Sequence, residues 1–124
     1  MTDRAAVLTK ALIRAARLLG ISRARVAQTL GVSEATVSRM YAGKHVLAPG
    51  RGKEWELAAL LVRLFRSLDS IVGSEDKARA WLNSDNAGLQ GRPIDLIARA
   101  EGLVSVLHYL DAVRGRIQSC RPDP

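Results

Sequence analysis

The chain has 124 residues, of which 48% are hydrophobic and 25% charged, a balance that excludes a disordered chain and allows one domain or two very small helical ones. Its formal net charge is +7, and the excess lies in residues 1–50, which carry eight lysines and arginines against two acidic residues. Residues 73–124 carry seven of each sign. A basic segment beside a neutral one indicates a polyanion-binding module joined to another module, although positive charge also serves solubility alone.

The sequence offers no material for a metal site, a cofactor site or a membrane span. Its one cysteine, Cys120, cannot form an internal disulfide, which fits a reducing cytoplasm. We find no cluster of cysteine and histidine, no glycine-rich phosphate loop, no signal peptide and no apolar run long enough to cross a bilayer. We therefore expect a cytoplasmic protein that needs no cofactor, metal or small-molecule substrate and binds no membrane.

Helical periodicity runs through the first half of the chain, and no segment alternates as a strand does. Three helices are predicted there, over residues 4–19, 22–30 and 34–42. Gly20 ends the first helix, and Ser22 and Ser33 are placed to cap the second and third. Residues 44–52 hold three glycines or prolines within four positions and are predicted to form a loop.

The second half of the chain begins with a long helix over residues 53–72, whose apolar stripe is broad enough to be buried on two sides. Further helices are predicted at residues 74–82, 93–102 and 103–114, with a polar loop at 83–91 and a polar tail at 118–124. The fold class is therefore all-α. Its expected parts are residues 1–50, a connecting or dimerisation helix at 53–73, and residues 74–124.

Residues 22–39 carry the pattern of a helix-turn-helix, in which two helices cross steeply over a very short turn. Ala27 is small enough for the helices to touch, and Gly31 accepts the positive φ of the turn. The apolar residues that pack between the helices are Val26, Leu30, Val32 and Val37. The alternative is a buried helical hairpin with no role in DNA binding.

This segment resembles the Xre-like, repressor-type helix-turn-helix family, whose layout fits all of residues 1–50. The resemblance implies that the second of the two helices lies in the major groove of duplex DNA. By position, the residues that face the bases or nearby phosphates are Ser33, Glu34, Ala35, Thr36, Ser38 and Arg39. The cations that flank the groove and meet phosphates are Arg23, Arg25 and Lys44.

Arg39 is the best candidate to bind a guanine, because its guanidinium can donate to O6 and N7 together. Ser33 is expected to cap the helix and touch a phosphate. Glu34 either accepts a hydrogen bond from cytosine N4 or only favours the helix N-terminus. Because one module offers few base contacts, we expect a homodimer on a palindromic operator. The helix at 53–72 either supplies the dimer interface or ties the two halves of one chain together.

A second pattern lies in the neutral half of the chain, where residues 80–97 read Ala-Trp-Leu-Asn-Ser-Asp-Asn-Ala-Gly-Leu-Gln-Gly-Arg-Pro-Ile-Asp-Leu-Ile. It resembles the toxin-binding domain of the Xre/MbcA/ParS antitoxin family over about residues 60–117. Folding alone also explains these residues, with Trp81 and Leu82 as core anchors and Pro93 as a helix start.

The resemblance implies an antitoxin of a type II toxin–antitoxin system, which binds and inhibits a RES-type, NAD-degrading toxin and represses its own operon. In that family the C-terminal end of the antitoxin lies in or near the active-site cleft of the toxin. The corresponding residues here are Tyr109, Arg114, Gly115, Arg116 and Arg121. The arginines have a second interpretation, as cations that suit the negative end of a helix dipole.

No group of residues indicates catalysis, and the chain is expected not to be an enzyme. His108 and Asp111 lie three positions apart without a nucleophile nearby, His45 suits a phosphate contact, and Cys120 lacks a base. Two other functions stay open. One is a stand-alone helix-turn-helix transcriptional repressor with a helical dimerisation domain, and the other is a protein-interaction module whose helix-turn-helix has lost DNA binding.

Overall fold

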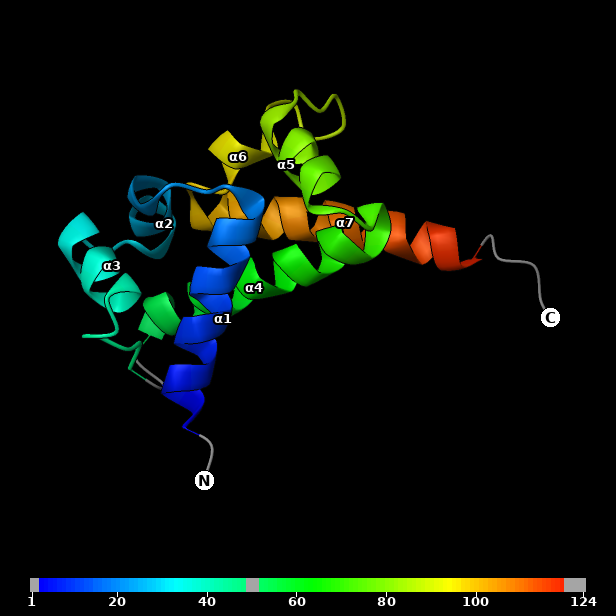
Figure 1. Ribbon diagram of the computed structural model, residues 1–124. Helices are drawn as coiled ribbons and strands as arrows, with labels where there is room; N and C mark the ends of the chain where they lie inside the picture. The colour runs from blue at the N-terminus through cyan, green and yellow to red at the C-terminus, as the bar shows by residue number, and fades with distance from the viewer. Residues whose placement is uncertain (1–2, 49–51, 120–124) are drawn as a thin grey trace.

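A computed structural model describes residues 3–48 and 52–119, with side chains up to residue 116. The described chain contains the helices α1 (Arg4–Leu19), α2 (Arg23–Leu30), α3 (Glu34–Tyr41), α4 (Gly52–Val72), α5 (Glu75–Asn83), α6 (Pro93–Leu96) and α7 (Ala100–Ser119) (Figure 1). Within these residues, β pairing is limited to one isolated bridge between Asn86 and Gly91. The predicted all-α class is confirmed. No described helix is long and apolar enough to span a membrane.

Capping residues explain where the first helices begin and stop. Ser22, Ser33 and Ser74 cap α2, α3 and α5, because each hydroxyl accepts a hydrogen bond from the backbone N–H three residues on, at 3.1–3.2 Å. Gly20 and Gly31 end α1 and α2 with φ of 69° and 73°, a left-handed conformation that glycine adopts without strain. These caps and stops confirm the boundaries predicted from the sequence.

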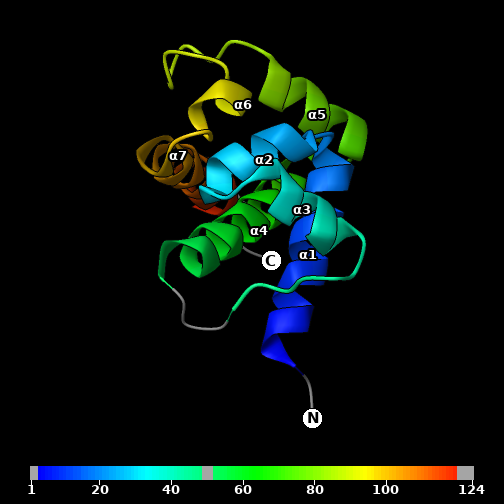
Figure 2. The ribbon, with the colours of Figure 1, turned by 90° about the vertical axis from the view of Figure 1, so that its left-hand side faces the viewer.

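The central element is α4, and four other helices pack against it (Figures 1 and 2). It contacts α1 and α2 from the first half of the chain and α5 and α7 from the second half. Leu61, Leu64 and Leu68 of α4 are fully buried in one core that extends from Leu12 in α1 to Leu107 in α7. Burial of this shared apolar surface holds the two halves of the chain against each other.

A buried threonine holds the segment after α3 against α1. Thr9 Oγ1 donates to the carbonyl oxygen of Ala5 at 2.7 Å and accepts from the backbone N–H of Leu47 at 3.0 Å. The Leu47 side chain is itself buried in the core. The chain just beyond α3 is therefore fixed, so that the end of α3 keeps its place beside α1.

The helices near the C-terminus differ from the prediction, which placed one helix over residues 93–102 and another over 103–114. Instead, α6 stops at Leu96, and α7 begins at Ala100 and continues to Ser119. Gly102 lies in the first turn of α7, where a Cβ atom would clash with the carbonyl oxygen of Leu96. This glycine permits a close approach between α6 and α7 and does not end a helix. Residues 120–124 of the predicted tail lie outside the described residues.

Candidate functional site

An exposed polar surface covers one side of α3, and α2 lies beside it (Figure 2). Val37 and Met40 point into the core and are buried. The exposed residues of the helix include Glu34, Ala35, Ser38 and Arg39, and Thr36 is half-buried. The residues that the sequence predicts to face DNA bases are thus brought together on one accessible helix.

Three side chains on this surface are joined by hydrogen bonds. Ser33 Oγ caps α3 and lies 2.9 Å from Thr36 Oγ1, and Arg39 Nη2 donates to Thr36 Oγ1 at 3.2 Å. The guanidinium of Arg39 is therefore oriented by the threonine hydroxyl, which is in turn held by the capping serine. The sequence predicted that these three residues share a surface, but not that they support one another.

At the end of α3, the ring of Tyr41 brings two arginines together. The guanidinium carbons of Arg17 and Arg23 lie 5.1 and 4.7 Å from the ring centroid, within cation–π range. The Tyr41 hydroxyl is buried and has no hydrogen-bond partner among the described residues. Burial raises the pKa of Tyr41 against the opposing effect of the two cations, so the hydroxyl is protonated at neutral pH. Arg23 is exposed, as is Lys44 in the segment after α3.

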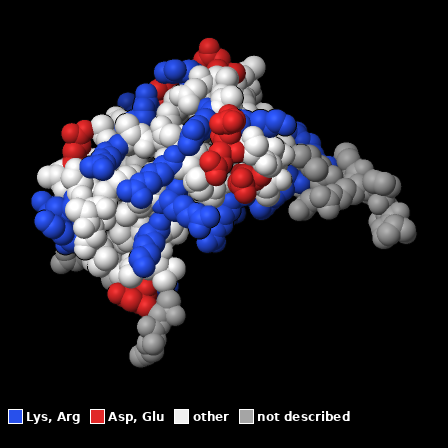
Figure 3. Space-filling model, viewed as in Figure 1, with Lys and Arg blue, Asp and Glu red and all other residues white. Residues whose placement is uncertain are grey.

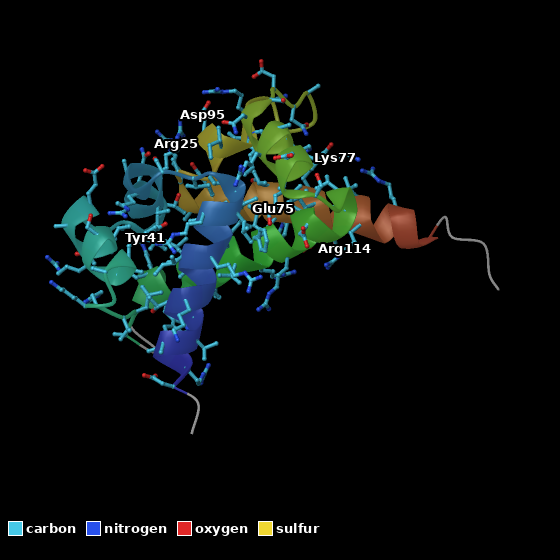
Figure 4. All side chains as sticks on the ribbon, viewed as in Figure 1. Arg25, Tyr41, Glu75, Lys77, Asp95 and Arg114 are labelled. Carbon is cyan, nitrogen blue, oxygen red and sulfur yellow. The ribbon has the colours of Figure 1, made fainter. Side chains whose placement is uncertain are left out.

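Arg25, which the sequence assigns to a DNA phosphate, is engaged within the protein. Its Nη1 donates to the carbonyl oxygen of Ile94 at 3.2 Å and lies 3.3 Å from Asp95 Oδ1 (Figure 4). Asp95 also accepts from Arg92 Nε at 2.9 Å. The hydrogen bond from Arg92 and the neighbouring Arg25 hold the pKa of Asp95 below its usual value, against partial desolvation. Arg25 therefore links α2 to α6.

A second arginine links the two halves at the C-terminal end of α1. Arg79 of α5 donates from Nε to the carbonyl oxygen of Leu18 at 2.8 Å and from Nη2 to that of Arg17 at 3.3 Å. Carbonyl groups at a helix end lack partners within the helix, and a cation there is favourable. The first half of the chain is thus tied to the second half by Arg25, through α2, and by Arg79, through α1, in addition to the shared core.

The residues predicted to bind a toxin differ in whether they contact other parts of the protein or are exposed at the end of α7. Tyr109 is half-buried and stacks on Trp81 of α5, with 6.2 Å between the ring centroids, so it holds α7 in place. Arg114 Nη2 lies 3.6 Å from Asp111 Oδ1, a carboxylate that also binds Arg63 of α4 at 2.8 Å. Gly115 and Arg116 are exposed near the end of α7. Arg121 lies outside the described residues.

The residues weighed for catalysis are not gathered into a site. Asp111 binds Arg63, whereas His108 and His45 are exposed on the surface. In the described part of the chain, no group of three or more histidine, cysteine, aspartate or glutamate residues is placed to hold a metal ion.

Comparison with protein-family models identifies both halves of the chain. The antitoxin Xre-like helix-turn-helix domain matches residues 1–63, and the antitoxin Xre/MbcA/ParS C-terminal toxin-binding domain matches residues 67–116. The chain belongs to the Xre/MbcA/ParS antitoxin family. It is therefore an antitoxin of a toxin–antitoxin system, with a helix-turn-helix followed by a toxin-binding domain.

A solved structure supports the assignment of this antitoxin. The crystal structure of the MbcT–MbcA toxin–antitoxin complex of M. tuberculosis contains a chain that is 27% identical to it, with a TM-score of 0.63. The match covers 86% of the antitoxin and 92% of that chain. No curated protein matches the antitoxin.

The sequence did not reveal the roles of Arg25 and Arg79 in this antitoxin. Their backbone partners lie 69 and 61 positions away along the chain. Hydrophobic periodicity and capping patterns act over a few turns of helix, so they carry no information about such contacts. The sequence likewise did not reveal that the Tyr41 ring contacts two arginines, because these arginines come from different helices.

Proposed function

We propose that this antitoxin represses its own operon through α3 and inhibits a RES-type, NAD-degrading toxin through the end of α7. The observation that carries the first part is the exposed surface of α3, on which Ser33, Thr36 and Arg39 are linked by hydrogen bonds. The match of residues 67–116 to a toxin-binding domain supports the second part. Residues 1–50 bind DNA, the helix at 53–73 connects, and residues 74–124 bind the toxin in the cytoplasm.

In the DNA complex, α3 enters the major groove and Arg39 donates to O6 and N7 of a guanine. Ser38 and Ala35 lie on the same exposed side of the helix, and Glu34 accepts from a cytosine N4 or acts only on the helix dipole. Ser33, Arg23 and Lys44 meet phosphates. Because one such module reads few base pairs, a homodimer on a palindromic operator supplies the remaining contacts.

Removal of the Arg39 guanidinium tests the DNA contact. We expect Arg39→Ala to weaken binding to the duplex upstream of the antitoxin gene by about 1–3 kcal/mol, with relaxed preference at one base pair of each half-site. Arg99→Ala is the matched control, because its side chain is 84% exposed in the second half of the chain. The site assignment fails if Arg39→Ala and Arg99→Ala bind the operator equally well.

In the toxin complex, the exposed cations at the end of α7 approach the active site of the toxin. Arg116 is exposed in the last turn of the helix, and Arg114 retains 42% of its side-chain exposure despite its contact with Asp111. We assign the same role to Gly115 and Arg121. Tyr109 acts indirectly, by holding α7 against α5.

Truncation tests whether the end of α7 inhibits the toxin. A chain that ends at Asp111 keeps the buried residues of α7 (Leu103, Val106, Leu107 and Leu110) and loses Arg114 and Arg116. We expect this chain to bind the operator but not to rescue growth from the RES-type protein encoded beside it, whereas the full chain rescues and co-purifies with that protein. Full rescue by the short chain would place inhibition elsewhere. A neighbour that neither co-purifies with the full chain nor is toxic would leave a DNA-binding regulator.

A further inference from the structure

Tyr41 lies where the helices of the helix-turn-helix meet α1. Arg17 comes from the last turn of α1, Arg23 is the first residue of α2, and Tyr41 is the last residue of α3. Both guanidinium groups are set on the Tyr41 ring, at 5.1 and 4.7 Å from its centroid. Two cations on one ring repel each other, and neither forms an ion pair with a carboxylate in the described chain. An anion bound there would relieve this repulsion.

A hollow of about 460 Å³ lies beside this arrangement. Tyr41 and Arg17 line it together with Lys10 and Arg14 of α1, and no acidic residue lines it. These cations are exposed, and Figure 3 shows lysine and arginine side chains gathered over α1 on this side of the molecule. The hollow therefore presents positive charge from Lys10, Arg14 and Arg17, and Arg17 also shares the Tyr41 ring with Arg23.

We propose that Arg17 and Arg23, positioned by the Tyr41 ring, bind one backbone phosphate of the duplex, and that Lys10 and Arg14 meet the phosphates next along the same strand. The proposal rests on DNA binding by α3. When that helix occupies the major groove, the sugar–phosphate strand that borders the groove passes the end of the helix, where Tyr41 lies. Arg23 also begins α2, so its backbone adds the favourable N-terminal end of a helix.

The ring gives the two arginines a defined place before DNA binds. A long cationic side chain that is free in solution loses rotamer freedom when it binds, and part of that loss is avoided when an aromatic ring already holds it. Tyr41 is thus a positioning residue, and its buried hydroxyl need not touch the phosphate. Phosphate contacts carry no sequence information, so this site adds affinity without base preference.

The test measures binding of the full chain to two duplexes of equal length, the region upstream of its gene and a scrambled sequence, over a range of salt concentrations. We expect Arg17→Gln to weaken binding to both duplexes by the same factor, roughly three- to tenfold near physiological salt. Arg17→Gln combined with Arg23→Gln should make the negative slope of log K against log salt shallower by about 0.9 for each bound protomer. Arg99→Gln, which removes an exposed arginine in the other half of the chain, should change neither quantity.

The role of the ring is tested separately. Tyr41→Leu should weaken DNA binding as much as Arg17→Gln does. Tyr41→Phe keeps the ring and should bind DNA as tightly as the unaltered chain. The thermal midpoint of each variant shows whether it is folded. If Tyr41→Leu does not fold, the phosphate site is tested by Arg17→Gln and Arg23→Gln. Rescue by phenylalanine distinguishes a platform for arginines from a role of the hydroxyl.

The outcomes separate this inference from the proposed function. If the unaltered chain binds neither duplex, DNA binding and the phosphate site fail together. If it binds the operator and Arg17→Gln leaves affinity and salt slope unchanged, the phosphate site is wrong while DNA binding by α3 stands. If Arg17→Gln leaves DNA binding intact but weakens the complex with the toxin, the surface binds an acidic protein segment, and the proposal is overturned.

Discussion

Two hydroxyl groups determine how the exposed surface of α3, which we propose faces DNA, is arranged. Thr36 Oγ1 accepts from Arg39 Nη2 at 3.2 Å and lies 2.9 Å from Ser33 Oγ. Arginine is a long side chain with many rotamers, so an exposed arginine without a partner would sample positions away from the base that we propose it binds. The threonine limits that sampling in the free protein, which lowers the cost of ordering the guanidinium on DNA.

Removal of this hydroxyl gives a prediction at the residue scale. We expect Thr36→Val, which keeps the branched shape, to weaken operator binding by about 1 kcal/mol, roughly fivefold in Kd. The fold is retained, because the capping bond from the Thr36 backbone N–H to Ser33 Oγ stays. Fluorescence anisotropy with the operator duplex measures the change.

A double-mutant cycle gives the control. If Thr36 acts by orienting Arg39, then Thr36→Val should have little further effect once Arg39 is replaced by alanine. A full fivefold loss in the Arg39→Ala background would instead show that the threonine contacts DNA on its own account.

At the scale of elements, two glycines that both look like helix ends in the sequence have different structural roles. Gly31 ends α2 with φ of 73°, and the sequence pattern predicted that role correctly. Gly102 lies within α7, where the missing side chain lets the carbonyl oxygen of Leu96 approach. The connection from α6 to α7 depends on this approach, since only residues 97–99 separate the two helices.

Gly102→Ala should therefore destabilise the antitoxin, although alanine favours helices. The added methyl group meets backbone, which cannot rotate away as a side chain can. We therefore expect the free energy of unfolding to fall by about 1–3 kcal/mol. Gly115→Ala, in the same helix, is the matched control, because a Cβ atom there meets nothing within 4 Å. That change should stabilise the protein by about 0.5–1 kcal/mol. Urea denaturation measures both, and equal effects of the two substitutions would contradict the close approach.

The helices and their ends were largely predictable from the sequence, because caps, stops and periodicity are local signals. The first three helices start and stop within about one residue of the prediction. The predicted boundary between the last two helices was wrong. Gly102 has the pattern of a helix end, and that pattern contains no information about how closely α6 and α7 approach each other. The candidate site follows the same rule: the exposed residues of α3 were predicted, whereas the tyrosine that gathers Arg17 and Arg23 was not.

At the scale of the whole molecule, charged contacts join the helix-turn-helix to the second half of the chain. Arg25 of α2 lies 3.3 Å from Asp95 of α6, and both side chains are partly exposed to solvent. Solvent screening makes such a pair weak in itself. The pair fixes the position of α2, which lies beside α3, relative to α6 in the half that matches a toxin-binding domain.

The pH dependence of stability tests this contact. Asp95 has a pKa below that of an unfolded aspartate, so its contribution to stability is present above a pH of about 4 and is lost as the pH falls through the folded value. We expect Asp95→Asn to be less stable than the parent at neutral pH and the difference to shrink below a pH of about 4. Asp85→Asn, in the exposed loop between α5 and α6, is the matched control. A difference between parent and Asp95→Asn that stays constant with pH would rule out this ionic contribution.

The shared core around α4 also bears on how antitoxins of this kind can diversify. The helix α4 packs against α1 and α2 from the first half of the chain and against α5 and α7 from the second half. Its buried Leu61, Leu64 and Leu68 belong to the core that both halves share. A recombination event that exchanged the last half of the gene for that of a relative would set α4 against a foreign α7 and leave mismatched packing. If the end of α7 binds the toxin as we propose, substitutions at that exposed end change the toxin partner with less damage to the core than shuffling of gene segments does.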